Sequence, residues 1–127
     1  MGYLNKVLLI GNLGKDPEVK AAPSGTLVCR LRLATSERVN HGEGNKESRT
    51  EWHSVIAFGR LAEISRDYLR KGRSIYVEGQ LHTRSFRKED GQTQKFTEIW
   101  ARDIQFMSPS AGTGPVAKVE SNRNGSA

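Results

Sequence analysis

Basic and aromatic side chains recur along the sequence at spacings that place them on shared surfaces. Arg30 and Arg32 are alternate residues of the run TLVCRLRLATSE, so they share the face opposite its leucines. Trp52 and Phe58 in TEWHSVIAFGR are an even number of positions apart, so in a strand they also share a face. Further candidates of these types are Arg60, Lys71, Arg84 and Phe86. Charges that follow phosphates and rings that stack on unpaired bases are what binding of single-stranded nucleic acid requires.

Both features also have a plainer interpretation. Paired arginines on a strand usually form a solvated face. Trp52, Ile56 and Phe58 lie on one face of their strand, with Val55 and Ala57 on the other. The first face is the more apolar, so hydrophobicity alone favours the core for Trp52 and Phe58. Periodicity shows only that these side chains lie together, and both interpretations remain open on this ground.

Motifs for catalysis and for cofactors are weak. The segment GNLGKD lacks the glycine spacing and the Lys-Ser/Thr pair of a phosphate-binding loop. His53 shares a strand face with Glu51 and lies next to Ser54, but no nucleophile motif accompanies them. The single cysteine and the three histidines have no metal-ligand spacing. We therefore expect no enzyme, no metal and no cofactor, although a phosphodiesterase assembled from distant residues is an alternative that sequence leaves open.

Length and composition predict one small domain. The chain has 127 residues, of which 35% are hydrophobic and 27% charged, and its formal net charge is +6. This basic excess suits a polyanionic partner. We expect an ordered domain over residues 1–107 and a flexible tail over residues 108–127, which are rich in Gly, Ser, Ala and Pro. The sequence has no apolar run of membrane-spanning length and no secretory signal, so a cytoplasmic location without membrane contact is expected.

The predicted elements are five strands and one helix. Strands are expected over about residues 3–14, 26–37, 50–58, 73–86 and 95–107, and a helix that Gly72 terminates over residues 59–72. Residues 39–49 predict a projecting polar loop, and Asp90-Gly91 predicts a turn. Helix placement after the third strand is typical of an all-β OB-fold barrel. The continuous Val7–Ile10 run predicts apolar cover on both faces, from a second subunit or from the chain's own helix.

Several segments resemble the bacterial and phage single-stranded-DNA-binding protein family. They are NKVLLIGNLGKDPEV, LATSE, TEWHSVIAFGRLAE, DYLRKG, YVEGQLHTR and IQFM, and they occur in the family's order over roughly residues 4–107. The resemblance implies an OB-fold that coats single-stranded DNA without sequence preference in replication, recombination and repair. It also implies a homotetramer, a dimer of dimers, located in the cytoplasm with the nucleoid. A related OB-fold acting as a replication-restart or RNA-binding interaction module is the alternative.

Site residues follow from the same resemblance. It implies that Trp52, Phe58 and Phe86 stack on bases and that Arg60, Lys71 and Arg84 face phosphates, to which the strand pattern adds Arg30 and Arg32. It further implies subunit contacts at His53, Tyr76, Glu78 and Gln80. If Trp52 and Phe58 stack on bases, their face points outward and the Val55 face points inward.

Two segments depart from the family's pattern. Arg38-Val39 stands where members often carry a tryptophan, so one stacking platform is missing or replaced. Family tails typically end in an acidic tip that recruits replication and repair proteins, whereas this chain ends in ESNRNGSA. Either the protein lacks that tip or the sequence stops short of it, and recruitment through it is not expected here.

Overall fold

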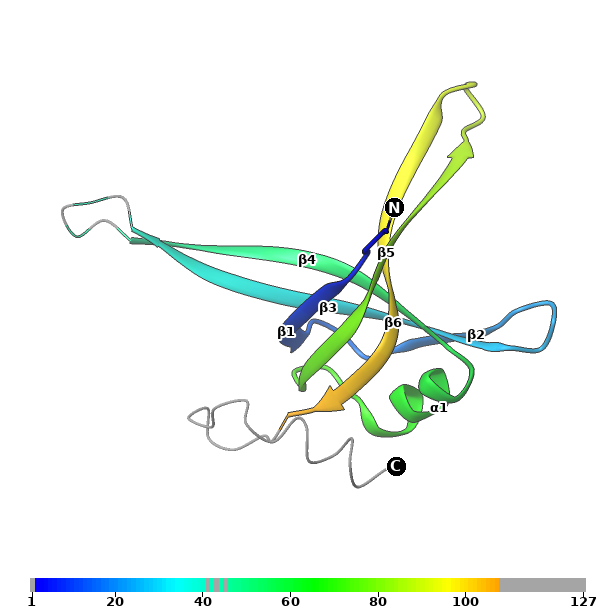
Figure 1. The fold of residues 1–127 in the computed structure, drawn as a ribbon, viewed down its shortest axis with the longest axis horizontal. Coiled ribbons are helices and arrows are strands. Elements are labelled where there is room, and N and C mark those ends of the chain that lie inside the picture. Colours follow the sequence, from blue (N-terminus) through cyan, green and yellow to red (C-terminus); the bar gives the residue numbers. More distant parts are fainter. Residues whose placement is uncertain (1, 41, 43, 45, 108–127) are drawn as a thin grey trace.

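Six β-strands and one α-helix make up the part of the chain that the structure describes. The computed structural model describes residues 2–40, 42, 44 and 46–107; the predicted tail lies outside this range. The elements are β1 Val7–Leu13, β2 Glu18–Ala21, β3 Leu27–Asn40, β4 Lys46–Phe58, α1 Gly59–Tyr68, β5 Ser74–Arg87 and β6 Thr93–Phe106. Figure 1 shows the β3–β4 and β5–β6 hairpins, and a shorter one between β2 and β3, extending from a central body with α1 below it. No helix in the described residues is long and apolar enough to cross a membrane.

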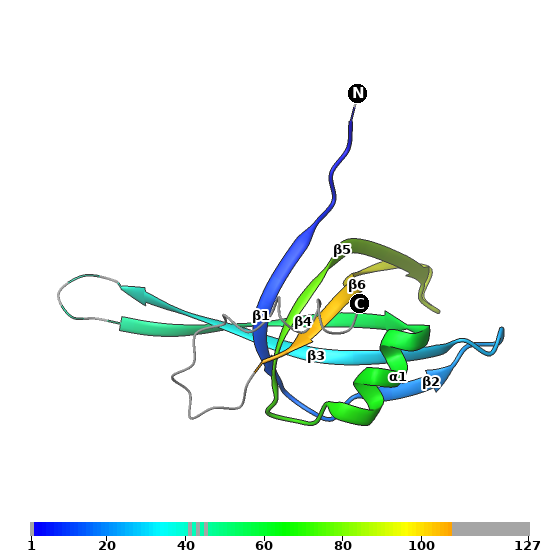
Figure 2. The ribbon, with the colours of Figure 1, turned by 60° about the horizontal axis from the view of Figure 1, so that its bottom comes forward.

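Five of the strands close into a barrel. β1 pairs antiparallel with β5 and with β3, β5 pairs with β6, and β3 pairs with β4. A parallel contact of β4 with β6, with Val55 opposite Ile99 and Ile56 opposite Trp100, completes the circuit. The predicted five-stranded OB-fold barrel with one helix is confirmed. Figure 2 shows β1, β5 and β6 crossing over the β3–β4 ribbon, with α1 beneath one end.

Strand β2 is a sixth strand that the sequence analysis did not predict. It pairs only with β3, from Glu18 opposite Arg30 to Ala21 opposite Leu27. Its four residues, EVKA, contain too few apolar positions to show alternation. A hairpin turn after β2 reverses the chain, so that β3 runs back alongside β2 and the two strands pair. Across this turn the Ala22 N–H donates to the Thr26 carbonyl.

The segment predicted as a loop over residues 39–49 is mostly strand. β3 runs to Asn40 and β4 begins at Lys46, and these two residues pair with each other. The prediction that the segment projects is confirmed, because the β3–β4 hairpin extends far from the barrel in Figure 1. The prediction of a loop is wrong for the paired residues. A two-stranded ribbon without a core beneath it needs no apolar alternation, since its ladder of backbone hydrogen bonds is the same for polar residues.

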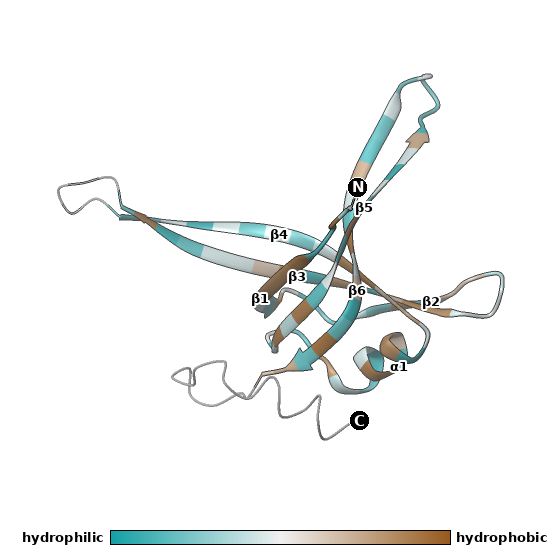
Figure 3. Ribbon diagram, in the orientation of Figure 1, coloured by the Kyte–Doolittle hydropathy of each residue, from teal (hydrophilic) through white to brown (hydrophobic). Residues whose placement is uncertain are grey.

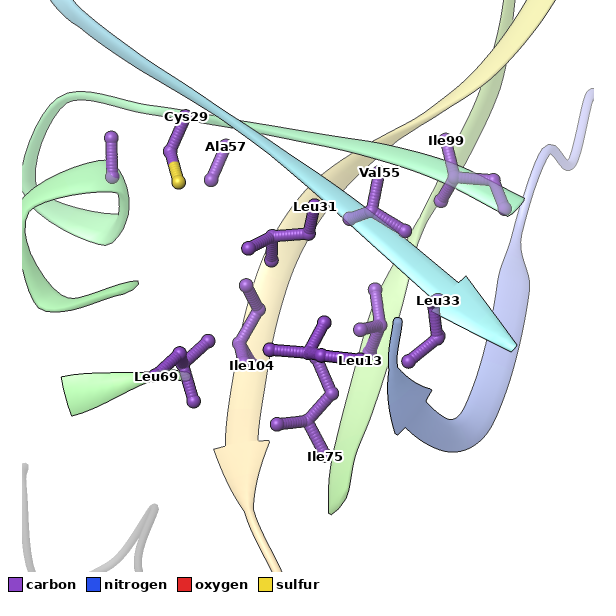
Figure 4. Close-up of a cluster of buried hydrophobic side chains, with 12 residues drawn as sticks. Leu13, Cys29, Leu31, Leu33, Val55, Ala57, Leu69, Ile75, Ile99 and Ile104 are labelled. Atoms are coloured by element: carbon purple, nitrogen blue, oxygen red, sulfur yellow. The ribbon is translucent and has the colours of Figure 1, made fainter. Parts of the chain in front are cut away.

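The barrel core comes from one face of each strand. β3 contributes Cys29, Leu31 and Leu33, as the alternation predicted, and β4 contributes Val55 and Ala57. Figure 4 shows these side chains gathered between the strands. In Figure 3 the hydrophobic colour likewise concentrates on the strands around the barrel, and the projecting β3–β4 and β5–β6 hairpins are mainly polar. The remaining buried members of this cluster are Leu13, Ala62, Leu69, Ile75, Val77, Ile99 and Ile104.

Helix α1 is shorter than predicted, and its predicted apolar set packs only in part: Leu61 packs against the core and Leu69 is buried in it just after the helix. It ends at Tyr68, and Leu69 already has an extended backbone, so Gly72 belongs to the following turn and does not terminate the helix. The buried helix residues are Ala62 and Ser65, whereas Tyr68, which the spacing placed on the apolar face, is exposed. Small residues of α1 face the barrel because the helix packs closely over the end of the barrel. A pattern based on large apolar residues does not reveal that small residues are buried.

Candidate nucleic-acid interface

Strand β4 turns Trp52 and Phe58 outward. Their side chains are 47% and 39% exposed, whereas Val55 and Ala57 on the opposite face are fully buried. The barrel therefore uses the less apolar face of this strand, and the outward interpretation of Trp52 and Phe58 is confirmed. Ile56 shares the outer face but is buried, because it lies at the bottom of a groove between β2 and β6.

Trp52 is held between a cation and a glycine. Register places Arg32 opposite Ser54, and the Arg32 guanidinium lies 5.7 Å from the centre of the Trp52 ring. Arg32 also donates from Nη1 to Ser54 Oγ at 3.3 Å. A side chain at Gly14 would overlap the Trp52 ring, so the glycine provides the space in which the ring lies. Both predicted members of this cluster, Arg32 and Trp52, are thus in contact.

A second ring cluster surrounds Phe58. Its ring meets Trp100 edge to face, with centroids 5.0 Å apart. Trp100 in turn stacks on His82 at 3.6 Å. Trp100 and His82 were not among the predicted binding residues. Alternation in KFTEIWARD could have found Trp100, because Phe96, Glu98 and Trp100 are alternate residues of one strand.

A third ring pair lies on the hairpin formed by β5 and β6. Phe86, predicted to stack on bases, packs against Phe96 with ring centroids 5.1 Å apart. Both rings remain 40% or more exposed. Phe86 therefore does not act as an isolated platform, and Phe96 is a further exposed ring that the sequence analysis missed.

A groove of about 420 Å³ lies beside the second ring cluster, with Phe58 and Trp100 in its lining. The β2 end and its turn form one wall, and the outer faces of β3 to β6 form the rest. Lining residues used below are Arg30, Ile56, Phe58, Arg84, Glu98 and Trp100. Two predicted phosphate contacts, Arg30 and Arg84, thus line the same groove as Phe58. At its rim, the ammonium of Lys15 hydrogen-bonds Glu18 at 2.7 Å and holds the pKa of that carboxyl below its usual value.

Arg60 and Lys71 do not line the groove. Arg60 lies in the first turn of α1 and pairs with Glu63, one turn along, at 3.1 Å. Lys71 follows α1, and its backbone N–H donates to Asp16 Oδ1 at 2.8 Å. Their phosphate contacts remain predictions from the family resemblance.

Of the residues predicted at subunit contacts, Gln80 lies opposite Trp100 in the β5–β6 pairing, and His53 lies on the face of β4 opposite Trp52. His53 is half-buried, and its Nε2 lies 2.8 Å from Thr35 Oγ1. Tyr76 donates to Glu78 Oε1 at 3.1 Å, and Glu78 pairs with Lys6 at 3.2 Å. Gln80 is half-buried on the same strand. Because Ser54 faces outward while His53 lies on the other face of β4, these two side chains do not form a catalytic pair.

Comparison with known proteins identifies the family. The sequence model of the Single-strand binding protein family matches residues 4–107. Over 122 residues the chain is 43% identical to Single-stranded DNA-binding protein 1 of Chlorobaculum tepidum, covering 95% of this chain and 75% of the relative. The chain belongs to the Single-strand binding protein family, as the sequence motifs indicated. Family membership places it among binding proteins and not among enzymes.

Two solved structures have the same fold. One is a Plasmodium falciparum SSB in complex with ssDNA, with a TM-score of 0.78, 33% identity, and coverage of 85% of this chain and 98% of that chain. The other is a deletion mutant of the single-stranded DNA binding protein from Thermus aquaticus, with a TM-score of 0.74 and 31% identity. That match covers 84% of this chain but only 52% of the Thermus chain.

Proposed function

We propose that this protein binds single-stranded DNA without sequence preference and protects it during replication, recombination and repair. The observation that carries the proposal is the outer face of the barrel, where exposed rings alternate with arginines: Arg32 beside Trp52, and Arg30 and Arg84 beside Phe58 and Trp100. The names of the relatives above, and the complex with ssDNA among them, support the same function.

The chemistry of this face favours single strands over duplexes. Every base has a flat face that can stack on an aromatic ring, but a duplex hides that face inside its own stack. Ring stacking therefore selects unpaired bases while tolerating any sequence. The arginines between the rings would contact phosphates, which also carry no sequence information.

A competition titration tests this function. Labelled oligo-dT is bound by the protein and then displaced by unlabelled oligo-dT, oligo-dA, duplex DNA or oligo-U. We expect both DNA single strands to compete and the duplex to compete weakly. Preferential displacement by oligo-U would instead favour the RNA-binding alternative. Time-dependent cleavage of the label in the presence of divalent ions would favour a phosphodiesterase.

We further propose that the protein forms a homotetramer in the cytoplasm, with the nucleoid. Leu8 and Ile10, on the outer face of β1, are 56% and 44% exposed in the single chain. They lie opposite Glu78 and Tyr76 of β5, within the YVEGQ segment that the family resemblance assigns to the contact between dimers. A second copy of the chain would cover this apolar strip.

A further inference from the structure

A nearly buried carboxylate lies in the middle of the basic groove. The Glu98 side chain is only 4% exposed, while the arginines around it remain about half exposed. Removing a carboxylate from water is unfavourable unless donors replace the water. A negative charge does not attract phosphates, so the charge of Glu98 by itself would not help this surface to bind a nucleic acid. The position of Glu98 in the groove must be explained by what it does to its neighbours.

Glu98 accepts hydrogen bonds from Arg84 and Trp100 and forms an ion pair with Arg30, so it contacts groups from three strands. Arg84 of β5 donates from Nε to Oε1 at 3.2 Å and from Nη2 to Oε2 at 2.9 Å. Trp100 of β6 donates from Nε1 to Oε1 at 3.3 Å. Arg30 of β3 lies with Nη1 3.6 Å from Oε2. Both oxygens of one carboxylate thus hold two of the groove's cations and one of its rings.

This arrangement leaves the two arginines able to bind a ligand. Arg84 gives Nε and Nη2 to Glu98, and the N–H groups of Nη1 are on the other side of the fork. A long, half-exposed arginine normally loses much rotamer freedom when it binds a phosphate, and a bidentate contact with Glu98 removes that freedom beforehand. The bond to Trp100 likewise fixes the ring that contacts Phe58 and His82.

We propose that Glu98 is a positioning residue of the DNA-binding face, which orients Arg84, Arg30 and Trp100 for a single strand. The inference rests on the proposed function and adds to it a residue that touches no nucleic acid itself. The ring and the cations act on the ligand, and Glu98 acts through them. Its negative charge disfavours phosphates, and its orienting effect outweighs that repulsion.

Two substitutions separate orientation from charge. Glu98→Gln removes the negative charge, so an effect of charge alone would tighten binding of oligo-dT. Orientation predicts the opposite, a loss of about tenfold, which is about 1.4 kcal/mol. Glu98→Asp keeps the charge but withdraws the oxygens by about 1.5 Å. Orientation predicts weaker binding for this variant too, whereas charge alone predicts no change.

Asp67→Asn is the matched control. Asp67 forms an ion pair with Arg66 at 2.8 Å on α1, outside the groove, so neutralising it should leave affinity unchanged. All variants are compared at a temperature where each is fully folded by circular dichroism. Affinities of Glu98→Gln and Glu98→Asp equal to or tighter than that of the parent protein would overturn the proposal. If the parent protein itself fails to bind oligo-dT, the proposed function fails first.

A double-mutant cycle and a spectroscopic readout exclude a merely structural role. If Glu98 acts partly through Arg84, Glu98→Gln should weaken binding less in an Arg84→Met background than in the parent protein, and the loss that remains reports the orientation of Arg30 and Trp100. The sequence has two tryptophans, so in a Trp52→Phe background the fluorescence reports Trp100 alone. We expect Glu98→Gln to shift its emission and to reduce its quenching by oligo-dT. Additive losses with an unchanged Trp100 signal would contradict the proposal.

Discussion

At the scale of single residues, Trp52 has neighbours that suit a binding role better than a core role. Core side chains of the barrel are surrounded by leucine, valine and isoleucine, whereas Trp52 contacts Arg32 and lies over Gly14. About half of its surface is exposed in the single chain. The ring can therefore be removed without opening a cavity in the barrel.

Trp52→Ala should weaken binding of oligo-dT far more than it lowers stability. A stacked base contributes roughly 1–3 kcal/mol by alanine substitution, so affinity should fall about 5- to 150-fold. A fully buried aromatic would instead cost about 3–5 kcal/mol of stability. Affinity is measured by anisotropy, and stability by urea unfolding. Leu31→Ala, a core substitution, is the control and should reverse the pattern; a Trp52→Ala protein that unfolds but binds normally would refute the assignment.

Cys29 should be unreactive in the folded protein. Its side chain is fully buried, and burial raises the pKa of the thiol from its usual value of 9.0 to about 11. We expect slow labelling by a thiol reagent at pH 8 and rapid labelling in urea. Since the unfolded chain loses the proton first, stability should fall by up to about 3 kcal/mol as the pH rises from 9 to 11. Cys29→Ala should show less of this fall; rapid labelling of the folded protein would contradict the burial.

Three of the exposed rings were predicted from the sequence, but the rings that pack against two of them were not. Trp52, Phe58 and Phe86 were predicted, but Phe96, Trp100 and Glu98 were not. Alternation could have placed these three residues on one face of β6, but it could not place that face beside β4, because the two strands meet through the parallel pairing that closes the barrel. No local pattern in the sequence encodes that pairing. A buried glutamate in a basic groove is equally invisible until its partners from other strands are in place.

At the scale of elements, two glycines make room for different kinds of neighbour. Gly14 makes room for a side chain, and Gly79 makes room for the backbone of the adjacent strand. A methyl group at Gly14 would overlap the Trp52 ring, whereas one at Gly79 would overlap the backbone carbonyl of Trp100. A side chain can turn away, but a paired strand cannot without breaking its ladder. The β5–β6 pairing also shifts register between Glu78 and Gly79, where Arg102 of β6 is skipped.

Gly14→Ala and Gly79→Ala should therefore have different effects. Gly14→Ala should displace the Trp52 ring, change its fluorescence and weaken oligo-dT binding, with a small loss of stability. Gly79→Ala should destabilise the β5–β6 pairing by about 1–3 kcal/mol, the usual cost of overpacking. Urea unfolding and fluorescence titration compare the two variants. Equal losses of stability would contradict the distinction.

The predictability of each element depends on whether it has a core beneath it. β3 alternates cleanly because one of its faces lines the barrel, and its core residues were predicted from that alternation. The β3–β4 hairpin leaves the barrel, so its residues, apart from Val39, are mostly polar on both faces and were taken for a loop. β2 is too short to show a period. The end of α1 was misplaced because Leu69 continues the apolar spacing of the helix but is buried from an extended residue beyond it.

At the scale of the whole molecule, the apolar strip on β1 predicts an oligomer. Leu8 and Ile10 stay exposed in one chain although they belong to the most apolar run of the sequence. Light scattering at micromolar concentration should give the mass of a tetramer, four times 14.1 kDa. Leu8→Glu should give smaller species, because charges placed in an apolar contact are costly. A monomer mass for the parent protein would contradict the oligomer.

The central claim, that exposed rings and arginines form one surface for single strands, is tested most directly by titrating intrinsic tryptophan fluorescence with oligo-dT at 50 and 200 mM salt. Stacking predicts quenching at both concentrations. If about four phosphates are neutralised per subunit, affinity should fall roughly fifty-fold between the two concentrations. Fluorescence that oligo-dT leaves unchanged, or an affinity indifferent to salt, would contradict the account.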